Sequence, residues 1–267
     1  MHVIGLMDDR RPMSAWPKLL LQFLVALGVV LLGEMRLLTA LDAFGPMGIA
    51  LSGFLTVIWI ILITNAINFL DNMDGLSGGV AAIAAAVFMS ATIINGQFFT
   101  AGAFGLLCGA LLGFLVFNVA PARIFMGDCG SLLVGFLLAA LTVRTTFVDT
   151  ADPDFALGSA WYGVLMPVIV LAIPLYDLVS VSILRIGQGR SPMRGDQQHL
   201  SHRLLDLGLS RRGSVLVIWA LALSTGVGGI VLGSLEPWQA VMVGAQTLAI
   251  LFVLGLLEMG ARRGNFR

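Results

Sequence analysis

The sequence predicts an all-α protein, a polytopic bundle of transmembrane helices. Hydrophobic residues make up 58% of the 267 residues, charged residues make up only 11%, and the mean hydropathy is +0.96. A soluble core cannot hide that much apolar surface. The apolar residues also form continuous runs such as VIWIILITNAI, whereas a transmembrane β-barrel requires short segments of alternating hydrophobicity.

About eight runs approach the length of roughly 20 residues that a helix needs to cross a bilayer. They cover residues 17–34, 47–66, 79–95, 98–117, 131–148, 160–183, 214–233 and 238–257. The preceding stretch MHVIGLM predicts the end of a helix and not a signal peptide, because Asp8 and Asp9 follow it directly. No long linker or internal repeat separates the runs, so residues 1–267 are expected to form a single integral-membrane domain.

The basic residues indicate how this bundle is oriented. If the chain crosses the membrane at every run, all Lys and Arg residues except Arg36 and Arg144 fall on the side where the chain begins. Under the positive-inside rule that side is the cytoplasm, so both termini and the long polar loop at 185–213 are expected there. Such a basic face suits anionic lipid head groups or a phosphorylated substrate.

Several carboxylates fall at the cytoplasmic ends of the predicted helices: Asp8, Asp9, Asp71, Asp74 and Asp128. Asp71 and Asp74 are three residues apart, so they share one face if their segment stays helical. Gathered carboxylates repel one another unless a cation joins them. Hard oxygen ligands favour Mg²⁺, with Mn²⁺ as an alternative, and Mg²⁺ completes its shell with water and substrate phosphates. The inferred chemistry is metal-assisted handling of a phosphate ester.

The segment ARIFMGDCGS at 122–131 predicts a site for an anion beside these acids. Gly127 and Asp128 are expected in a tight turn, and Ser131 is expected to begin a helix whose N-terminal amides favour negative charge. Phe125, three residues before the aspartate, is placed to stack on a base.

The long cytoplasmic loop contributes a third cluster of polar residues. His199 and His202 lie on one face if their segment is helical, and Arg203 is adjacent. Such a cluster binds phosphate or moves protons near neutral pH.

Each of these features also has a simpler explanation. An aspartate pair after a helix often caps it, loop histidines are more often solvated, and a lone phenylalanine mostly packs. Asp177 is harder to dismiss, because an acid inside an apolar run is costly unless it is paired, and Arg185 two turns on is the expected partner. The joint occurrence of these residues on one side of the membrane favours the functional interpretation.

Four segments together resemble the signatures of one enzyme family. LMDDRR at 6–11, NAINFLDNMDGLSGG at 65–79, ARIFMGDCGSLLVG at 122–135 and SPMRGDQQHLSHRLLDLGLS at 191–210 resemble those of the polyprenyl-phosphate N-acetylhexosamine-1-phosphate transferases. The resemblance implies a magnesium-dependent enzyme of the bacterial cytoplasmic membrane, with its active site facing the cytoplasm. It implies transfer of a sugar 1-phosphate, preferably GlcNAc-1-phosphate, from a UDP-sugar to undecaprenyl or a related polyprenyl phosphate. UMP is released, and the product begins a cell-envelope glycan.

The resemblance also implies a role for individual residues. Asp128 matches the magnesium ligand, with Asn68 as a second oxygen donor, while Asp8 and Asp9 match the acids that deprotonate or position the lipid phosphate, in a division of roles left open. The remaining matches line the substrate site: Asp71 and Asp74 beside the nucleotide, Asn118 and Phe125 at uridine, His199 and His202 near the diphosphate, and Asn65, Gly127 and Arg203 around the substrate. No nucleic-acid partner is implied, and a homodimer is left open.

The chain departs from the family pattern at three places. It begins at Met1 with one helix stub where members carry two or three helices, so we expect those first helices to be lacking. Ser201 stands where some members have another histidine, and Asn72 where the peptidoglycan-precursor enzyme has glycine, and both favour the branch that uses UDP-GlcNAc. Two alternatives stay open: an inactive membrane remnant of the family and, with less support, a transporter, which should show paired repeats around a midplane site.

Overall fold

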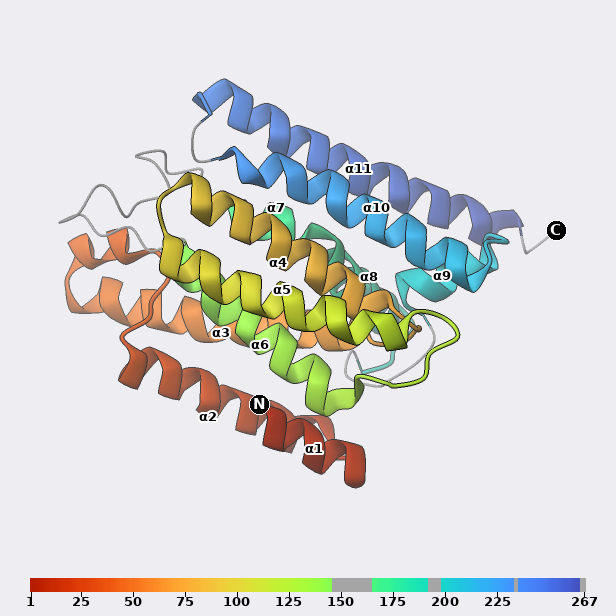
Figure 1. Ribbon diagram of the computed structural model, residues 1–267, viewed down its shortest axis with the longest axis horizontal. Coiled ribbons are helices and arrows are strands. Elements are labelled where there is room, and N and C mark those ends of the chain that lie inside the picture. The colour runs from red at the N-terminus through yellow and green to blue at the C-terminus, as the bar shows by residue number, and fades with distance from the viewer. Residues whose placement is uncertain (146–164, 192–197, 233–234, 265–267) are drawn as a thin grey trace.

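The structure, a computed structural model, describes residues 1–145, 165–191, 198–232 and 235–264, and the regular elements in these residues are all helices (Figure 1). The elements in chain order are α1 (His2–Arg10), α2 (Ala15–Gly33), the 3₁₀ helix η1 (Thr39–Phe44), α3 (Pro46–Leu70), α4 (Leu76–Ile94), α5 (Phe98–Asn118), α6 (Gly127–Thr145), α7 (Met166–Val170), α8 (Ala172–Gly187), α9 (Leu200–Asp206), α10 (Arg211–Ile230) and α11 (Pro237–Gly264). The predicted all-α class is confirmed.

Seven helices in the described part of the chain are long and apolar enough to cross a membrane: α2, α3, α4, α5, α6, α10 and α11. They match seven of the eight predicted runs. Many leucine, valine and phenylalanine side chains on these helices remain exposed, which suits contact with lipid. The protein is therefore a multi-pass membrane protein.

The remaining predicted run, 160–183, is not one continuous helix. Residues 160–164 lie outside the described residues, and the rest forms α7 and α8, which meet at Leu171 (φ −96°, ψ 19°). Pro174 follows in the first turn of α8, where a residue without a backbone N–H is tolerated. The prediction of one uninterrupted helix over this run is therefore wrong, because the described part is divided into α7 and α8.

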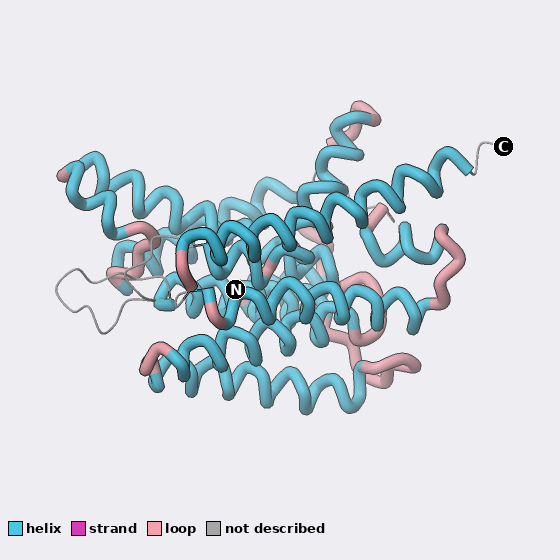
Figure 2. Tube along the Cα trace, turned by 90° about the horizontal axis from the view of Figure 1, so that it is seen from above, coloured by secondary structure: helices cyan, strands magenta, loops and turns pink. Residues whose placement is uncertain are grey.

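Helix α4 lies inside the bundle, with α5 and α10 packed against it (Figure 1). The view turned by 90° shows the described part of the chain as helices joined by loops (Figure 2). In its apolar window 67% of the residues are buried, compared with 17% in α2 and in α11. Small residues make this position possible. A Cβ atom on Gly79 would lie only 2.0 Å from Cε2 of Trp219, so the glycine lets the α10 indole lie directly on the α4 backbone.

The short helix α1 crosses the N-terminal end of α6, a membrane helix more than a hundred residues later (Figure 1). A Cβ atom on Gly5 would lie 2.3 Å from the carbonyl oxygen of Asp128, so the two backbones touch at this glycine. This contact brings the C-terminal turn of α1, with Asp8 and Asp9, beside Asp128.

Candidate active site

Carboxylates from three separate segments meet where α1 ends, α3 ends and α6 begins. Asp8 and Asp9 come from the last turn of α1, Asp71 follows α3, and Asp128 lies in the first turn of α6. The helix expected to begin at Ser131 begins at Gly127 instead, which corrects that prediction. The chain therefore carries Asp128 on a helix and not on the preceding turn.

The Asp9 carboxylate accepts hydrogen bonds from the backbone of α6. Its Oδ1 accepts a hydrogen bond from the amide of Asp128 at 2.8 Å, and its Oδ2 accepts one from the amide of Cys129 at 3.0 Å. Gly127 has a φ of +62°, and a Cβ there would come within 2.9 Å of Asp9 Oδ2. Burial raises the pKa of Asp9, but these amide hydrogen bonds outweigh burial and leave the pKa below its usual value. Asp9 thus caps the helix that carries Asp128.

The Asp8 carboxylate interacts mainly with the side chains of Lys18 and Asp128. Lys18 Nζ lies 2.7 Å from Asp8 Oδ2 and 2.6 Å from Asp128 Oδ2, so one ammonium group bridges the two carboxylates. Burial raises the pKa of Asp8, but hydrogen bonds with Asp128, Lys18 and the amide of Met13 lower it to about 2. Asn68 completes the group by donating from Nδ2 to Asp128 Oδ1 at 2.7 Å and to Ser131 Oγ at 2.8 Å.

Asp71 differs from Asp8 and Asp9, because its surroundings raise its pKa instead of lowering it. Burial and the negative charges of Asp128 and Asp9 raise its pKa to about 7, although a hydrogen bond with the Gly127 backbone acts the other way. The four carboxylates thus interact with one another, and a single ammonium group, that of Lys18, pairs with two of them, Asp8 and Asp128. Negative charge is in excess, and a divalent cation would neutralise it.

The donor set suits a hard cation that binds few protein ligands. Among the described residues, no three His, Cys, Asp or Glu side chains are arranged as a complete metal-binding set. Mg²⁺ does not need one, because it commonly uses one or two carboxylates and takes its other ligands from water and substrate phosphates. Both oxygens of Asp128 accept hydrogen bonds, Oδ1 from Asn68 Nδ2 and Oδ2 from Lys18 Nζ, so Mg²⁺ at Asp128 would replace one of these contacts.

The residues between α3 and α4 form a turn, so the condition for Asp71 and Asp74 to share a helical face, a helical segment, is not met. Gly75 has a φ of +77°, and its amide donates to Oδ1 of the buried Asn118 at 2.9 Å. Asn118 Nδ2 in turn donates to the carbonyl of Ile124 at 2.8 Å. Asp74 Oδ2 accepts from the amide of Ala122 at 3.1 Å, so the 71–75 turn is held against the 119–126 loop.

Phe125 and Asn65 have different surroundings. Phe125 lies in the 119–126 loop and is 76% exposed, free to stack on a ligand. Asn65 Nδ2 donates to Gln22 Oε1 at 2.6 Å and to the Ile61 carbonyl, which ties α3 to α2.

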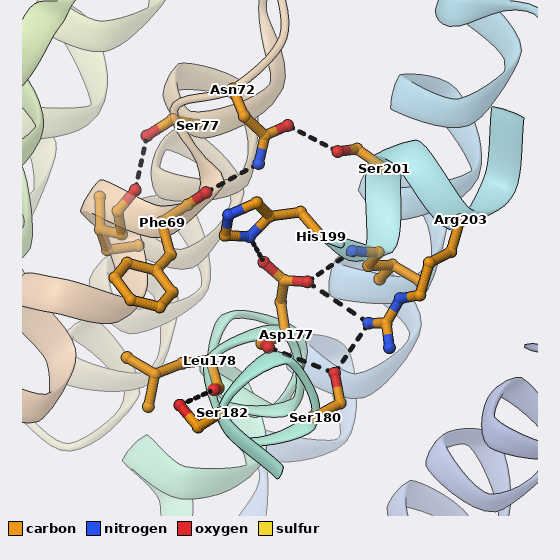
Figure 3. Close-up of polar contacts among 12 residues, drawn as sticks. Phe69, Asn72, Ser77, Asp177, Leu178, Ser180, Ser182, His199, Ser201 and Arg203 are labelled. Carbon is orange, nitrogen blue, oxygen red and sulfur yellow. Dashed lines mark hydrogen bonds and ion pairs between the residues drawn. The ribbon is translucent and has the colours of Figure 1, made fainter. Parts of the chain in front are cut away.

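The two histidines diverge, contrary to the shared face predicted for them. His199 is the N-cap residue of α9 with an extended backbone, and its ring is buried against Asp177 (Figure 3). His202 lies within α9, where burial and then the nearby His199 lower its pKa. Arg203 is 7% exposed and points to Asp177 and Glu258 instead of into a cavity.

Two cavities of about 470 Å³ each border this region. One is lined by Asp8, Lys18, Asn65 and Asn68 together with apolar side chains of α2, α3 and α8. The other is lined by the 72–75 segment, His202, Arg211, Arg212 and apolar residues of α10, including Trp219. A predominantly apolar cavity thus reaches the acid cluster, and a cavity with cationic residues adjoins the turn that carries Asp74.

Residues 1–146 match the family described as glycosyl transferase family 4. The chain belongs to glycosyl transferase family 4. It is similar to a Bacillus subtilis protein named a probable undecaprenyl-phosphate N-acetylglucosaminyl 1-phosphate transferase, with 32% identity over 90% of this chain and 65% of that protein. It is also 34% identical to the decaprenyl-phosphate N-acetylglucosaminephosphotransferase of Mycobacterium leprae, over 98% of this chain and 70% of that protein.

A third relative is the undecaprenyl-phosphate alpha-N-acetylglucosaminyl 1-phosphate transferase of Escherichia coli K12, which is 30% identical over 84% of this chain and 61% of that protein. The family 4 chain therefore spans about two thirds of the length of these relatives. The predicted family membership is confirmed.

The structure of this family 4 member also adds residues that sequence reasoning missed. Lys18 is the central cation of the acid cluster, and its one signal in the sequence is that it is the only lysine of the chain. Ser201 Oγ donates to Asn72 Oδ1 at 2.5 Å, which joins α9 to the 71–75 turn. Neither contact has a local sequence pattern, because each joins segments far apart in the chain.

Proposed function

We propose that this chain transfers GlcNAc-1-phosphate from UDP-GlcNAc to a polyprenyl phosphate and releases UMP. The proposal rests on one observation above all: the Lys18 ammonium bridges Asp8 and Asp128 beside an apolar cavity, and a second cavity with cationic residues adjoins the 71–75 turn. The names of the relatives supply the sugar and the class of lipid.

The cavity beside Lys18 suits the lipid acceptor. Its polar end presents the Lys18 ammonium, which binds a phosphate, while Leu19, Leu62 and Leu178 line the rest with apolar surface. An isoprenoid chain needs such an apolar path, and a phosphate at its end needs a cation. One cavity therefore provides for both ends of the acceptor.

The cavity beside Asp74 suits the nucleotide-sugar donor. Arg211, Arg212 and His202 provide positive or hydrogen-bonding groups for a diphosphate, and the exposed Phe125 on the neighbouring loop provides a surface for a base to stack on. Asp74 and Asn118 fix the position of that loop relative to the donor cavity.

In the proposed reaction, an oxygen of the lipid phosphate attacks the phosphorus that bears the sugar, and UMP leaves without a covalent enzyme intermediate. Lys18 holds the attacking phosphate, and Asp8 holds Lys18 in place as an ionised partner. Asp9 keeps the first turn of α6 fixed so that Asp128 stays at the reaction centre. Mg²⁺, held by Asp128 with Asn68, would supply neutralisation of charge on the phosphates.

The proposed setting is a bacterial cytoplasmic membrane, with the acid cluster and both termini on the cytoplasmic side. The positive-inside distribution of Lys and Arg supports this orientation. A nucleotide-sugar made in the cytoplasm would then reach the donor cavity without crossing the bilayer.

The direct test is UMP release by the purified 267-residue chain given UDP-GlcNAc, undecaprenyl phosphate and Mg²⁺, with Asp128→Asn as the control. Release that requires both the lipid and Mg²⁺, and that disappears in Asp128→Asn, is the expected result. A folded protein that releases no UMP with this donor or with other UDP-N-acetylhexosamines would overturn the proposal and favour the inactive remnant.

A further inference from the structure

A buried network of charged and polar side chains joins α8, α9 and α11. Figure 3 shows its part between Asp177, His199 and Arg203. At its centre is Asp177, whose side chain has no exposed surface. Its Oδ2 lies 2.9 Å from His199 Nδ1, and its Oδ1 accepts a hydrogen bond from the amide of Leu200 at 2.5 Å. One carboxylate therefore holds both the imidazole ring and the first turn of α9.

The contact with Asp177 determines which nitrogen of His199 carries the proton. A carboxylate accepts hydrogen bonds, so neutral His199 must carry its proton on Nδ1, and Nε2 is left as the basic nitrogen. Phe69 fixes the ring from another direction, because the two rings meet edge to face at 89° with centroids 5.5 Å apart. Phe69 also lines the cavity that contains Asp8 and Lys18, so the ring of His199 is packed directly behind the proposed reaction centre.

Arg203 extends the network to the last helix of the chain. Its Nη2 lies 3.5 Å from Asp177 Oδ1 and 2.7 Å from Ser180 Oγ, and its Nη1 lies 3.0 Å from Oε2 of Glu258 in α11. The hydroxyl of Tyr176 also donates to Glu258 Oε2, at 3.0 Å. Buried charges are tolerated only when they are paired and hydrogen-bonded, and each charge here has a partner of opposite sign.

We propose that Asp177 is a positioning residue, which fixes His199 as the Nδ1–H tautomer and so leaves Nε2 as the basic nitrogen that can take a proton from a substrate phosphate. Arg203, held by Glu258, keeps the Asp177 carboxylate oriented for this task. The catalytic part of this inference rests on the proposed function, whereas the tautomer does not.

The second oxygen of Asp177 distinguishes this role from simple helix capping. A cap for α9 needs only the hydrogen bond between Oδ1 and Leu200, which an asparagine can also accept. An asparagine at 177 would retain that cap and nearly the same volume, but its NH₂ group favours a histidine with the proton on Nε2. Asp177→Asn therefore separates the two roles within one folded protein.

The tautomer can be measured without any activity. The chain has three histidines, so ¹⁵N-histidine labelling gives three pairs of ring signals, one for Nδ1 and one for Nε2 in each pair, and His199→Gln and His202→Gln assign them. We expect His199 to be Nδ1-protonated when neutral in the wild-type protein and Nε2-protonated in Asp177→Asn. Asp42→Asn is the control that keeps the wild-type tautomer, because Asp42 pairs with Arg36 outside this network. An unchanged His199 signal in Asp177→Asn would overturn the proposal.

A double-mutant cycle on UMP release tests the catalytic consequence. We expect Asp177→Asn to lower kcat about tenfold or more with little change in KM for the UDP-sugar, and to have no further effect in a His199→Gln background. Losses that multiply in the double variant, at matched thermal stability, would show that Asp177 does not act through His199. If the wild-type chain releases no UMP, the proposed function fails, while the tautomer experiment still decides the Asp177–His199 relationship.

Discussion

Asp9 caps the helix that carries Asp128: its Oδ1 accepts the amide hydrogen of Asp128 at 2.8 Å, and its Oδ2 accepts that of the next residue. Its neighbour Asp8 instead contacts side chains, with Lys18 Nζ at 2.7 Å. Two consecutive aspartates therefore have different tasks. Asp9 stabilises a helix end, and Asp8 orders the charged groups of the cluster.

This division predicts different outcomes for the two asparagine variants. Asp9→Asn keeps an oxygen that accepts one amide hydrogen bond, but it loses the second bond and the charge at the helix N-terminus, so the protein should lose about 1–2 kcal/mol of stability and keep most of its UMP release. Asp8→Asn removes one of the two carboxylates that pair with Lys18 and should reduce UMP release about a hundredfold or more. Thermal unfolding measures the change in stability of both variants, and a UMP-release assay measures their activity. If Asp9→Asn is inactive at unchanged stability, Asp9 acts on the substrate directly.

The contact between α1 and α6 at Gly5 predicts a sharp steric effect. A methyl group on Gly5 would lie 2.3 Å from the Asp128 carbonyl oxygen, and a backbone atom cannot rotate away. Gly5→Ala should therefore destabilise the protein by about 1–3 kcal/mol and displace Asp8 and Asp9 from Asp128. Gly28→Ala in α2 is the matched control, because no atom lies within 4 Å of its new Cβ. Equal thermal stability of the two variants would contradict this packing.

Asp71 predicts how stability depends on pH in the absence of metal. Its pKa in the folded protein is about 7, above the usual value, so the folded state is favoured when Asp71 is protonated, and this stability is lost as pH rises from about 4 to about 7. Asp71→Asn should abolish this loss of stability with rising pH. Because each pKa unit corresponds to about 1.4 kcal/mol, the substitution should stabilise the metal-free protein at pH 8 by up to about 4 kcal/mol. Thermal unfolding with EDTA at pH 6 and pH 8 measures it.

Asp74→Asn is the control for this prediction, because an asparagine at 74 still accepts the hydrogen bond from the Ala122 amide. We expect the control to show the same pH dependence as the wild-type protein between pH 6 and pH 8. A wild-type protein that is as stable at pH 8 as at pH 6 would show that the Asp71 carboxyl is not destabilised by its surroundings.

Chemical modification of Lys18 tests whether its ammonium group binds the lipid phosphate. It is the only lysine in the chain, so apart from the N-terminus an amine-acylating reagent modifies one site, which mass spectrometry can quantify. If Lys18 holds the lipid phosphate, undecaprenyl phosphate should slow its acylation, and UDP-GlcNAc alone should not. Lys18→Met should raise KM for the lipid about tenfold to a hundredfold, because a hydrogen bond between charged groups contributes about 1.5–3 kcal/mol.

Lys18→Arg is the control that retains a positive charge, although the wider guanidinium group fits a site between two carboxylates less well. It should restore part of the lipid affinity that Lys18→Met loses. Acylation of Lys18 at the same rate with and without the lipid would exclude it as the phosphate ligand.

The residue sequence alone determined the fold class, seven of the membrane helices and the side of the bundle where the acids gather. These features follow from hydrophobicity summed over about 20 residues and from the positions of charges along the chain, which are local quantities. The family motifs around Asp8, Asp71, Asp128 and His199 are also local, so they could be found without coordinates.

Only the tertiary structure decided which partner each charge has. Asp8 and Lys18 are near in sequence, but their common partner Asp128 is 110 residues beyond Lys18, and Asp177 finds His199 in another helix. The break between α7 and α8 at Leu171 could not be predicted from the sequence either, because these two helices together have the composition of one continuous span. Hydrogen bonds and ion pairs act over a few ångströms between segments that packing brings together, and no local pattern in the chain encodes those distances.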